Sequence, residues 1–170
     1  MPWAIELYLD DASANAIRRV RPLDLLHPHV SLSVAESIDA SVEAALSDWA
    51  ERQQPIPVTL DHWGMFLSES AVLFLAPRDR TLLQAVHLDF HRATAGRLGR
   101  EWAYYLPEQW VPHCTVADQL PIEDLGTVAL QVRELALPVA GTLSRVALVQ
   151  FGSGRVERWV GPLGAAGKGD

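Results

Sequence analysis

Two short segments of the sequence decide how the chain is expected to fold and where its chemistry lies. Residues 29–34 have the sequence His-Val-Ser-Leu-Ser-Val, and residues 110–117 have the sequence Trp-Val-Pro-His-Cys-Thr-Val-Ala. Successive side chains of a β-strand point to opposite faces, so a strand puts His29 and Ser31 on one face and apolar residues on the other. The same alternation places His113 with Thr115. The sequence therefore predicts two strands that each present an imidazole and a hydroxyl to a cleft.

This pairing suits phosphodiester chemistry. In-line displacement at phosphorus needs a base for the attacking oxygen and an acid for the leaving oxygen, and two imidazoles that titrate near neutrality can take both roles. The hydroxyls of Ser31 and Thr115 can donate hydrogen bonds to the non-bridging phosphate oxygens. A single His-x-Ser pattern is frequent by chance, whereas two copies in apolar strands favour a joint function for His29 and His113. The arrangement requires no metal and no cofactor.

Hydrophobic periodicity outside the two segments predicts further strands and helices. The predicted strands cover residues 3–9, 29–34, 56–62, 65–75, 111–117, 143–151 and 156–160, with turns at Gly64 and at 68–70. The predicted helices run over 14–20, from a cap at Ser37 or Asp39 to Pro55, from Asp79 to about Gly96, and from Pro121 to about Leu135. The order strand, helix, histidine strand, helix occurs twice. It indicates two similar lobes that face each other.

Length and composition favour one domain that folds without covalent or metal cross-links. The chain has 170 residues, of which 49% are hydrophobic, enough to bury a core. We expect a single two-lobed domain over 1–160 and a flexible tail over 161–170. The single cysteine, Cys114, excludes an internal disulfide. Strand alternation turns Cys114 away from His113, which favours a buried thiol over a nucleophile.

Charge and the N-terminal sequence limit the expected partners. The net charge is −7 and the sequence pI is about 5.3, which argues against binding along a long nucleic-acid backbone. A nucleic-acid substrate should therefore be short or held at one end. The first residues lack the basic segment and apolar run of a signal peptide, and no stretch approaches the ~18 apolar residues of a membrane span. We expect a cytoplasmic protein without membrane contact, and a monomer.

The two motifs resemble the paired His-x-Ser/Thr-hydrophobic motifs of the 2H phosphoesterase superfamily, and most closely its bacterial and archaeal 2′,5′ RNA ligase-like cyclic phosphodiesterases. The similarity extends to about residue 160. It implies an α+β fold of two lobes, each an antiparallel sheet with helices outside, facing a central cleft with pseudo-twofold symmetry. It also implies metal-free hydrolysis or formation of 2′-linked phosphoesters. The family motif positions fall on His29 with Ser31 and on His113 with Thr115.

The remaining histidines have simpler interpretations. His27 lies two residues before His29 and can assist it or bind phosphate, although only His29 has a hydroxyl two positions later. Pro28 between them favours a strand that starts after it. His87 and His91 are four apart on a predicted helix, a spacing that permits a shared metal, but a surface pair is favoured because no third ligand is evident.

Aromatic and basic residues provide weaker candidates for substrate contact. Tyr104, Tyr105 and Trp110 precede the second motif and can stack on a nucleobase or pack in the core. Two groups of arginines can hold a substrate phosphate at the cleft rim or belong to solvated helix faces. The first group contains Arg18, Arg19 and Arg21, and the second contains Arg97 and Arg100.

The two motifs and the resemblance together predict an enzyme that opens a 2′,3′-cyclic phosphate on an RNA end or a small nucleotide by water attack, with reversible 2′,5′ RNA ligase activity. His29 and His113 are the predicted acid and base, in either assignment, and Ser31 and Thr115 are predicted to bind the phosphate. The first alternative is a non-catalytic module that binds a nucleotide or another phosphorylated ligand in the same cleft. The second is a metal-dependent hydrolase built on His87, His91 and a carboxylate.

Overall fold

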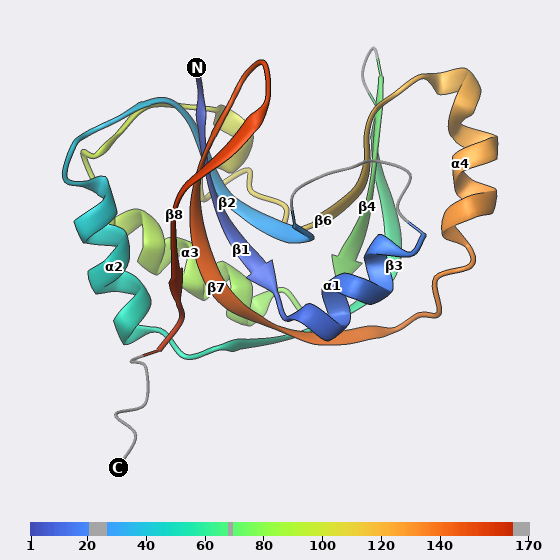
Figure 1. The fold of residues 1–170 in the computed structure, drawn as a ribbon, viewed down its shortest axis with the longest axis horizontal. Coiled ribbons are helices and arrows are strands. Elements are labelled where there is room, and N and C mark those ends of the chain that lie inside the picture. The colour runs from blue at the N-terminus through green and yellow to red at the C-terminus, as the bar shows by residue number, and fades with distance from the viewer. Residues whose placement is uncertain (21–26, 68–69, 165–170) are drawn as a thin grey trace.

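The computed structural model describes residues 1–20, 27–67 and 70–164 (Figure 1). The strands of this part form one sheet with antiparallel pairing throughout: β1 (Trp3–Leu9), β2 (His29–Ile38), β3 (Ile56–Leu67), β4 (Ala71–Pro77), β5 (Leu98–Glu101), β6 (Cys114–Leu120), β7 (Val139–Phe151) and β8 (Arg155–Pro162). The α-helices are α1 (Asp11–Arg18), α2 (Val42–Arg52), α3 (Thr81–Ala93) and α4 (Leu125–Val132), and two 3₁₀ turns occupy Ala103–Tyr105 and Ile122–Asp124.

The sheet forms a ring with two lobes. Strands β1, β2, β6, β4, β3 and β7 pair in that order, and β7 pairs again with β1. One end of β7 pairs with β3 in the second lobe, and the rest pairs with β1 and β8 in the first. Helices α2 and α3 lie outside the first lobe, and α4 lies outside the second (Figure 1). The prediction of an α+β fold with two lobes is confirmed.

Strand β1 shows how the sequence pattern separates the core from the site. Ile5, Leu7 and Leu9 point into the main hydrophobic core, as the alternation over 3–9 predicts. The opposite face carries Tyr8, which joins a smaller apolar cluster, and Glu6, whose carboxylate contacts His29. The apolar face therefore fixes the strand, and the other face is available to the site.

The predicted turn at Gly64 is wrong. β3 continues through this residue to Leu67, and Gly64 pairs with Phe74 of β4. A Cβ atom at Gly64 would overlap the Phe74 ring, so this glycine makes room for a neighbouring aromatic ring within the sheet. The turn predicted at 68–70 falls largely on residues 68–69, which lie outside the described residues.

Element ends differ from the predicted ones for local reasons. β6 begins at Cys114 rather than at residue 111, so His113 directly precedes the strand. Pro112 has no N–H for a sheet hydrogen bond, which favours this later start. β8 continues to Pro162 and Leu163 is buried, beyond the domain end expected at 160. Residues 165–170 of the expected tail lie outside the described residues.

Candidate active site between the two lobes

The two motifs meet where the lobes join. Val30, which follows His29, pairs with Cys114, which follows His113. In an antiparallel register this pairing places His29 beside Thr115 and Ser31 beside His113. We call these four side chains the histidine site. The structure therefore brings all four predicted site residues together, in an arrangement with approximate twofold symmetry.

Each imidazole of the histidine site makes an equivalent hydrogen bond to the backbone carbonyl two residues before it. Nδ1 of His29 lies 2.6 Å from the carbonyl oxygen of His27, and Nδ1 of His113 lies 2.6 Å from that of Val111. A carbonyl oxygen only accepts, so Nδ1 carries the donated proton in each ring. Nε2 is therefore the nitrogen of each ring whose protonation can change, and in His29 it lies 3.3 Å from Oε1 of Glu6. The carbonyl of residue i−2 thus fixes the tautomer in both lobes.

His113 lies in an apolar environment. Its ring centroid is 5.0 Å from the Phe66 centroid and 5.0 Å from the Phe74 centroid. Burial lowers the pKa of His113, and the nearby charge of His29 lowers it further. His113 is therefore disposed toward its neutral form, in which Nε2 can accept a proton.

The close packing of Gly64 against Phe74 leads to a prediction about stability. Gly64→Ala is expected to lower the free energy of unfolding by about 1–3 kcal/mol, because the added methyl group must displace the Phe74 ring. Chemical denaturation measures this change. Gly126→Ala in α4 is the control, since a Cβ atom there meets no atom within 4 Å. Glycine is unfavourable within a helix, so Gly126→Ala should not lower stability. If Gly64→Ala is as stable as the parent, the close packing at Gly64 is contradicted.

The hydroxyls of the histidine site are half-buried. Ser31 is held from two sides: its carbonyl accepts a 2.9 Å hydrogen bond from Trp110 Nε1, and its hydroxyl is hydrogen-bonded to Tyr105. Burial raises the pKa of Tyr105, so its phenol stays neutral and keeps its hydroxyl proton. Thr115 belongs to β6 and is likewise partly accessible. Both hydroxyls are therefore partly open to solvent.

Two charged residues that the sequence did not indicate lie near His29. Glu6 is buried, and its Oε1 lies 3.3 Å from His29 Nε2 and contacts Arg155 Nη2. The sequence signal for Glu6 was a lone carboxylate in an otherwise apolar strand. Arg155 follows the Gly-Ser-Gly segment at 152–154 and gave no such signal. Its position depends on the pairing of β8 with β7.

His27 supports His29 through its backbone. Its Nδ1 accepts a 2.8 Å hydrogen bond from Arg18 Nη2, and its Nε2 donates to the Leu9 carbonyl at 2.7 Å. Its ring also stacks on Tyr8, with centroids 4.6 Å apart. Burial lowers the pKa of His27, and the charge of Arg18 lowers it further. Both ring nitrogens thus have protein partners, and the carbonyl of His27 orients His29.

The interpretation of His87 and His91 as a surface pair is wrong. His87 is 1% exposed and stacks on Trp110 with parallel rings 3.9 Å apart. Its Nε2 donates to the Leu32 carbonyl at 2.9 Å, while His91 Nε2 lies 3.1 Å from the Tyr105 carbonyl. Burial lowers the pKa of His87 to about 4. Among the described residues, no group of three or more histidine, cysteine, aspartate or glutamate side chains is placed to hold a metal.

The aromatic and basic residues that the sequence suggested for substrate contact lie in different environments. Trp110 is buried and Tyr104 is exposed, so the two do not form one stacking surface. Arg97 donates to carbonyl oxygens at the end of α3, and Arg100 adopts a positive φ of 53° in β5. Arg21 lies outside the described residues. Cys114 is fully buried, as its place in the alternation predicts.

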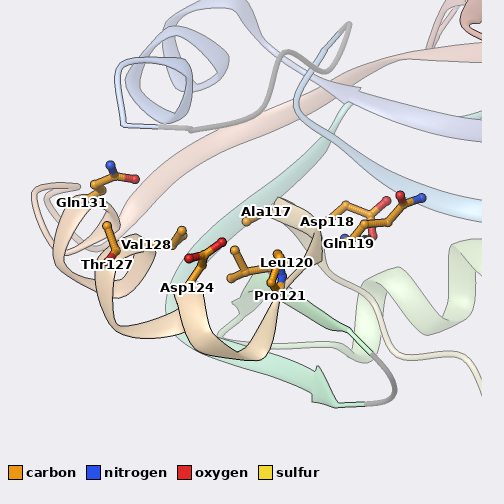
Figure 2. Close-up of a pocket in the computed structure, with 9 residues that line it drawn as sticks. All are labelled: Ala117, Asp118, Gln119, Leu120, Pro121, Asp124, Thr127, Val128 and Gln131. Atoms are coloured by element: carbon orange, nitrogen blue, oxygen red, sulfur yellow. Dashed lines mark hydrogen bonds between the residues drawn. The ribbon is translucent and has the colours of Figure 1, made fainter.

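A cavity of about 350 Å³ lies beside the second lobe (Figure 2). It is lined by the end of β6, including Asp118 and Gln119, and by side chains of the segment from Asp124 to Gln131. Neither histidine of the histidine site lines it. Asp118 is nevertheless close enough to act on the pKa of His113, which it raises slightly against the larger effect of burial.

The sequence matches the model of the 2'-5' RNA ligase superfamily over residues 9–155. The chain therefore belongs to this superfamily of 2H phosphoesterases, which places it among phosphodiesterase-type enzymes. No curated protein matches the sequence. No helix in the described part of the chain is long and apolar enough to cross a membrane.

Solved structures share the fold along almost the whole chain. E. coli LigT complexed with 3'-AMP gives a TM-score of 0.60 at 19% sequence identity, covering 96% of this chain and 98% of that chain. A phosphoesterase gives 0.63 at 18% identity, with coverage of 96% and 98%. TT0787 of Thermus thermophilus gives 0.54 at 17% identity, with the same coverage. At these identities the likeness concerns the fold.

Proposed function

We propose that the histidine site hydrolyses 2′,3′-cyclic phosphates on RNA ends or small nucleotides, without a metal. The observation that carries this proposal is the matched hydrogen bonding of His29 and His113. Each Nδ1 donates to a backbone carbonyl, so Nε2 is the nitrogen of each ring that can gain or lose a proton. Two such nitrogens at the junction of the lobes suit a reaction that needs one base and one acid.

In the proposed reaction, one Nε2 takes a proton from water as the water oxygen bonds to phosphorus. The bond from phosphorus to one ribose oxygen breaks, and the other Nε2 gives that oxygen a proton. Ser31 and Thr115 donate hydrogen bonds to the non-bridging oxygens, where negative charge is concentrated. The same steps with a ribose 5′-hydroxyl in place of water, and with the bond from phosphorus to the 3′ oxygen breaking, form a 2′,5′ phosphodiester, which is the proposed ligation.

A nucleotide-sized substrate is supported by two observations. The net charge of −7 disfavours binding of a long phosphate backbone. Crystal structures of E. coli LigT hold 3'-AMP, NADP+ and ATP, so a protein of this fold accepts nucleotides. Product analysis identifies which nucleotide base the enzyme prefers and which phosphate ester it forms.

The test is hydrolysis of nucleoside 2′,3′-cyclic phosphates in excess EDTA. We expect full activity to persist, because the imidazoles supply both proton transfers, and chromatography against 2′- and 3′-monophosphate standards shows which ester bond breaks. Activity that EDTA removes and Mg²⁺, Mn²⁺ or Zn²⁺ restores contradicts the metal-free mechanism. If no phosphodiester is cleaved while nucleotides bind with affinity that depends on His29 and His113, the site is a non-catalytic binding module.

A further inference from the structure

Glu6 is a charged side chain to which the proposed reaction assigns no role. It lies on β1 between apolar residues, and only 1% of it is exposed. A carboxylate is rarely buried to this degree unless it is paired. Its Oε1 meets Arg155 of β8 and lies 3.3 Å from His29 Nε2. The same oxygen of Glu6 therefore contacts both the Arg155 guanidinium and His29 Nε2, the nitrogen that is proposed to transfer a proton.

The hydrogen bond at Nδ1 of His29 indicates the protonation state of Nε2 in its contact with Glu6. Nδ1 of His29 already donates its proton to the His27 carbonyl at 2.6 Å. A neutral ring would therefore turn a lone pair at Nε2 toward Glu6, and two acceptors would face each other across 3.3 Å. The contact is favourable when Nε2 carries a proton as well. The geometry around His29 thus fits an imidazolium ring.

The surroundings of the two histidines differ in charge. His29 is faced by Glu6 of β1, by Arg155 of β8 through that carboxylate, by the Tyr8 ring with centroids 6.4 Å apart, and by His113 across the junction. His113 is packed between phenylalanine rings, and the acidic group acting on it, Asp118, is exposed. Among the described contacts, His29 therefore has a buried carboxylate 3.3 Å from its Nε2, and His113 has none.

We propose that Glu6 is a positioning residue that keeps His29 protonated, which makes His29 the acid and His113 the base of the reaction. This inference rests on the proposed hydrolysis and assigns each histidine its role. His113 Nε2 takes the proton of the attacking water. His29 Nε2 gives its proton to the departing ribose oxygen, and exchange of protons with solvent restores both rings.

Histidine ring NMR tests the assignment without any substrate. In the parent protein, ¹⁵N shifts near neutral pH should show protons on both nitrogens of His29 and on Nδ1 alone of His113, with signals assigned from His29→Ala and His113→Ala. In Glu6→Gln, which keeps the side-chain shape, the titration midpoint of His29 should fall by about one pH unit or more. Glu157→Gln is the control, because it removes an equal charge whose carboxylate accepts from Tyr8 at 2.8 Å instead.

A neutral His29 in the parent near pH 7, or a midpoint in Glu6→Gln that does not fall or falls no more than in Glu157→Gln, overturns the inference. The parent measurement decides the question even if Glu6→Gln does not fold. In the enzyme assay, the alkaline limb of kcat should move to lower pH in Glu6→Gln while the acidic limb stays. Because the NMR result is independent of turnover, a failed inference is distinguished from a failed proposed function.

Discussion

His29→Ala and His113→Ala should each lower kcat for cyclic phosphate hydrolysis by about 10²–10⁴-fold, the usual contribution of a positioned acid or base. The reason is that each variant removes one of the two Nε2 atoms that the matched hydrogen bonds leave available. Initial rates at saturating substrate measure the loss. Because acid and base act in one step, the double variant should lose little more than either single variant.

His62→Ala is the matched control for these variants, since the His62 side chain is 65% exposed and pairs with Asp61. Its kcat should equal that of the parent. Each histidine also donates to a backbone carbonyl, so thermal unfolding must show that the variants fold before their rates are compared. A folded His29→Ala or His113→Ala that retains parent activity contradicts two-histidine catalysis.

The pH dependence of kcat/KM provides a second test of the roles of the two histidines. Burial and the charge of His29 lower the pKa of His113, so its neutral form persists to lower pH than for an exposed histidine. If His113 is the base, kcat/KM should rise with pH through this lowered pKa, on the acidic side of 6.5. The limb should disappear in His113→Ala. A profile that is flat between about pH 5 and 8 in the parent, with chemistry limiting the rate, contradicts paired histidine catalysis.

The sequence could propose these four site residues because each pair is local. A histidine and a hydroxyl two positions apart on one strand share a face whatever the rest of the chain does. Their approach to each other was expected from the repeated order of elements and from the resemblance. It depends on the Val30 to Cys114 pairing. Local alternation also predicted the burial of Cys114.

The residues that surround the histidines are set by contacts between distant strands, and sequence periodicity does not contain them. Glu6 reaches His29 across a register shift between β1 and β2, and it meets Arg155 from the last strand. His87 is buried because Trp110 stacks on it from another segment. Gly64 looked like a turn because glycine often marks one, whereas here it accommodates Phe74.

Removal of both hydroxyls of the histidine site should lower kcat by about 10²–10³-fold while both imidazoles remain in place, the loss expected when donors to a developing anionic centre are deleted. The variant is Ser31→Ala with Thr115→Val, which preserves the shape of the threonine. KM should change less than kcat if the hydroxyls bind the transition state more tightly than the substrate. Steady-state rates on a nucleoside 2′,3′-cyclic phosphate measure both constants.

Two controls separate this effect from simple disturbance of the site. Thr115→Ser keeps a donor at the same position and should retain most of the activity. Tyr105→Phe removes the hydroxyl to which Ser31 is hydrogen-bonded in the free protein, so it reports what the loss of that bond alone does. If the double hydroxyl variant retains the parent kcat, then Ser31 and Thr115 do not bind the phosphate in the transition state. The charge at phosphorus would then have to be met by another group near His29, such as Arg155, which contacts the same Glu6 carboxylate oxygen as His29.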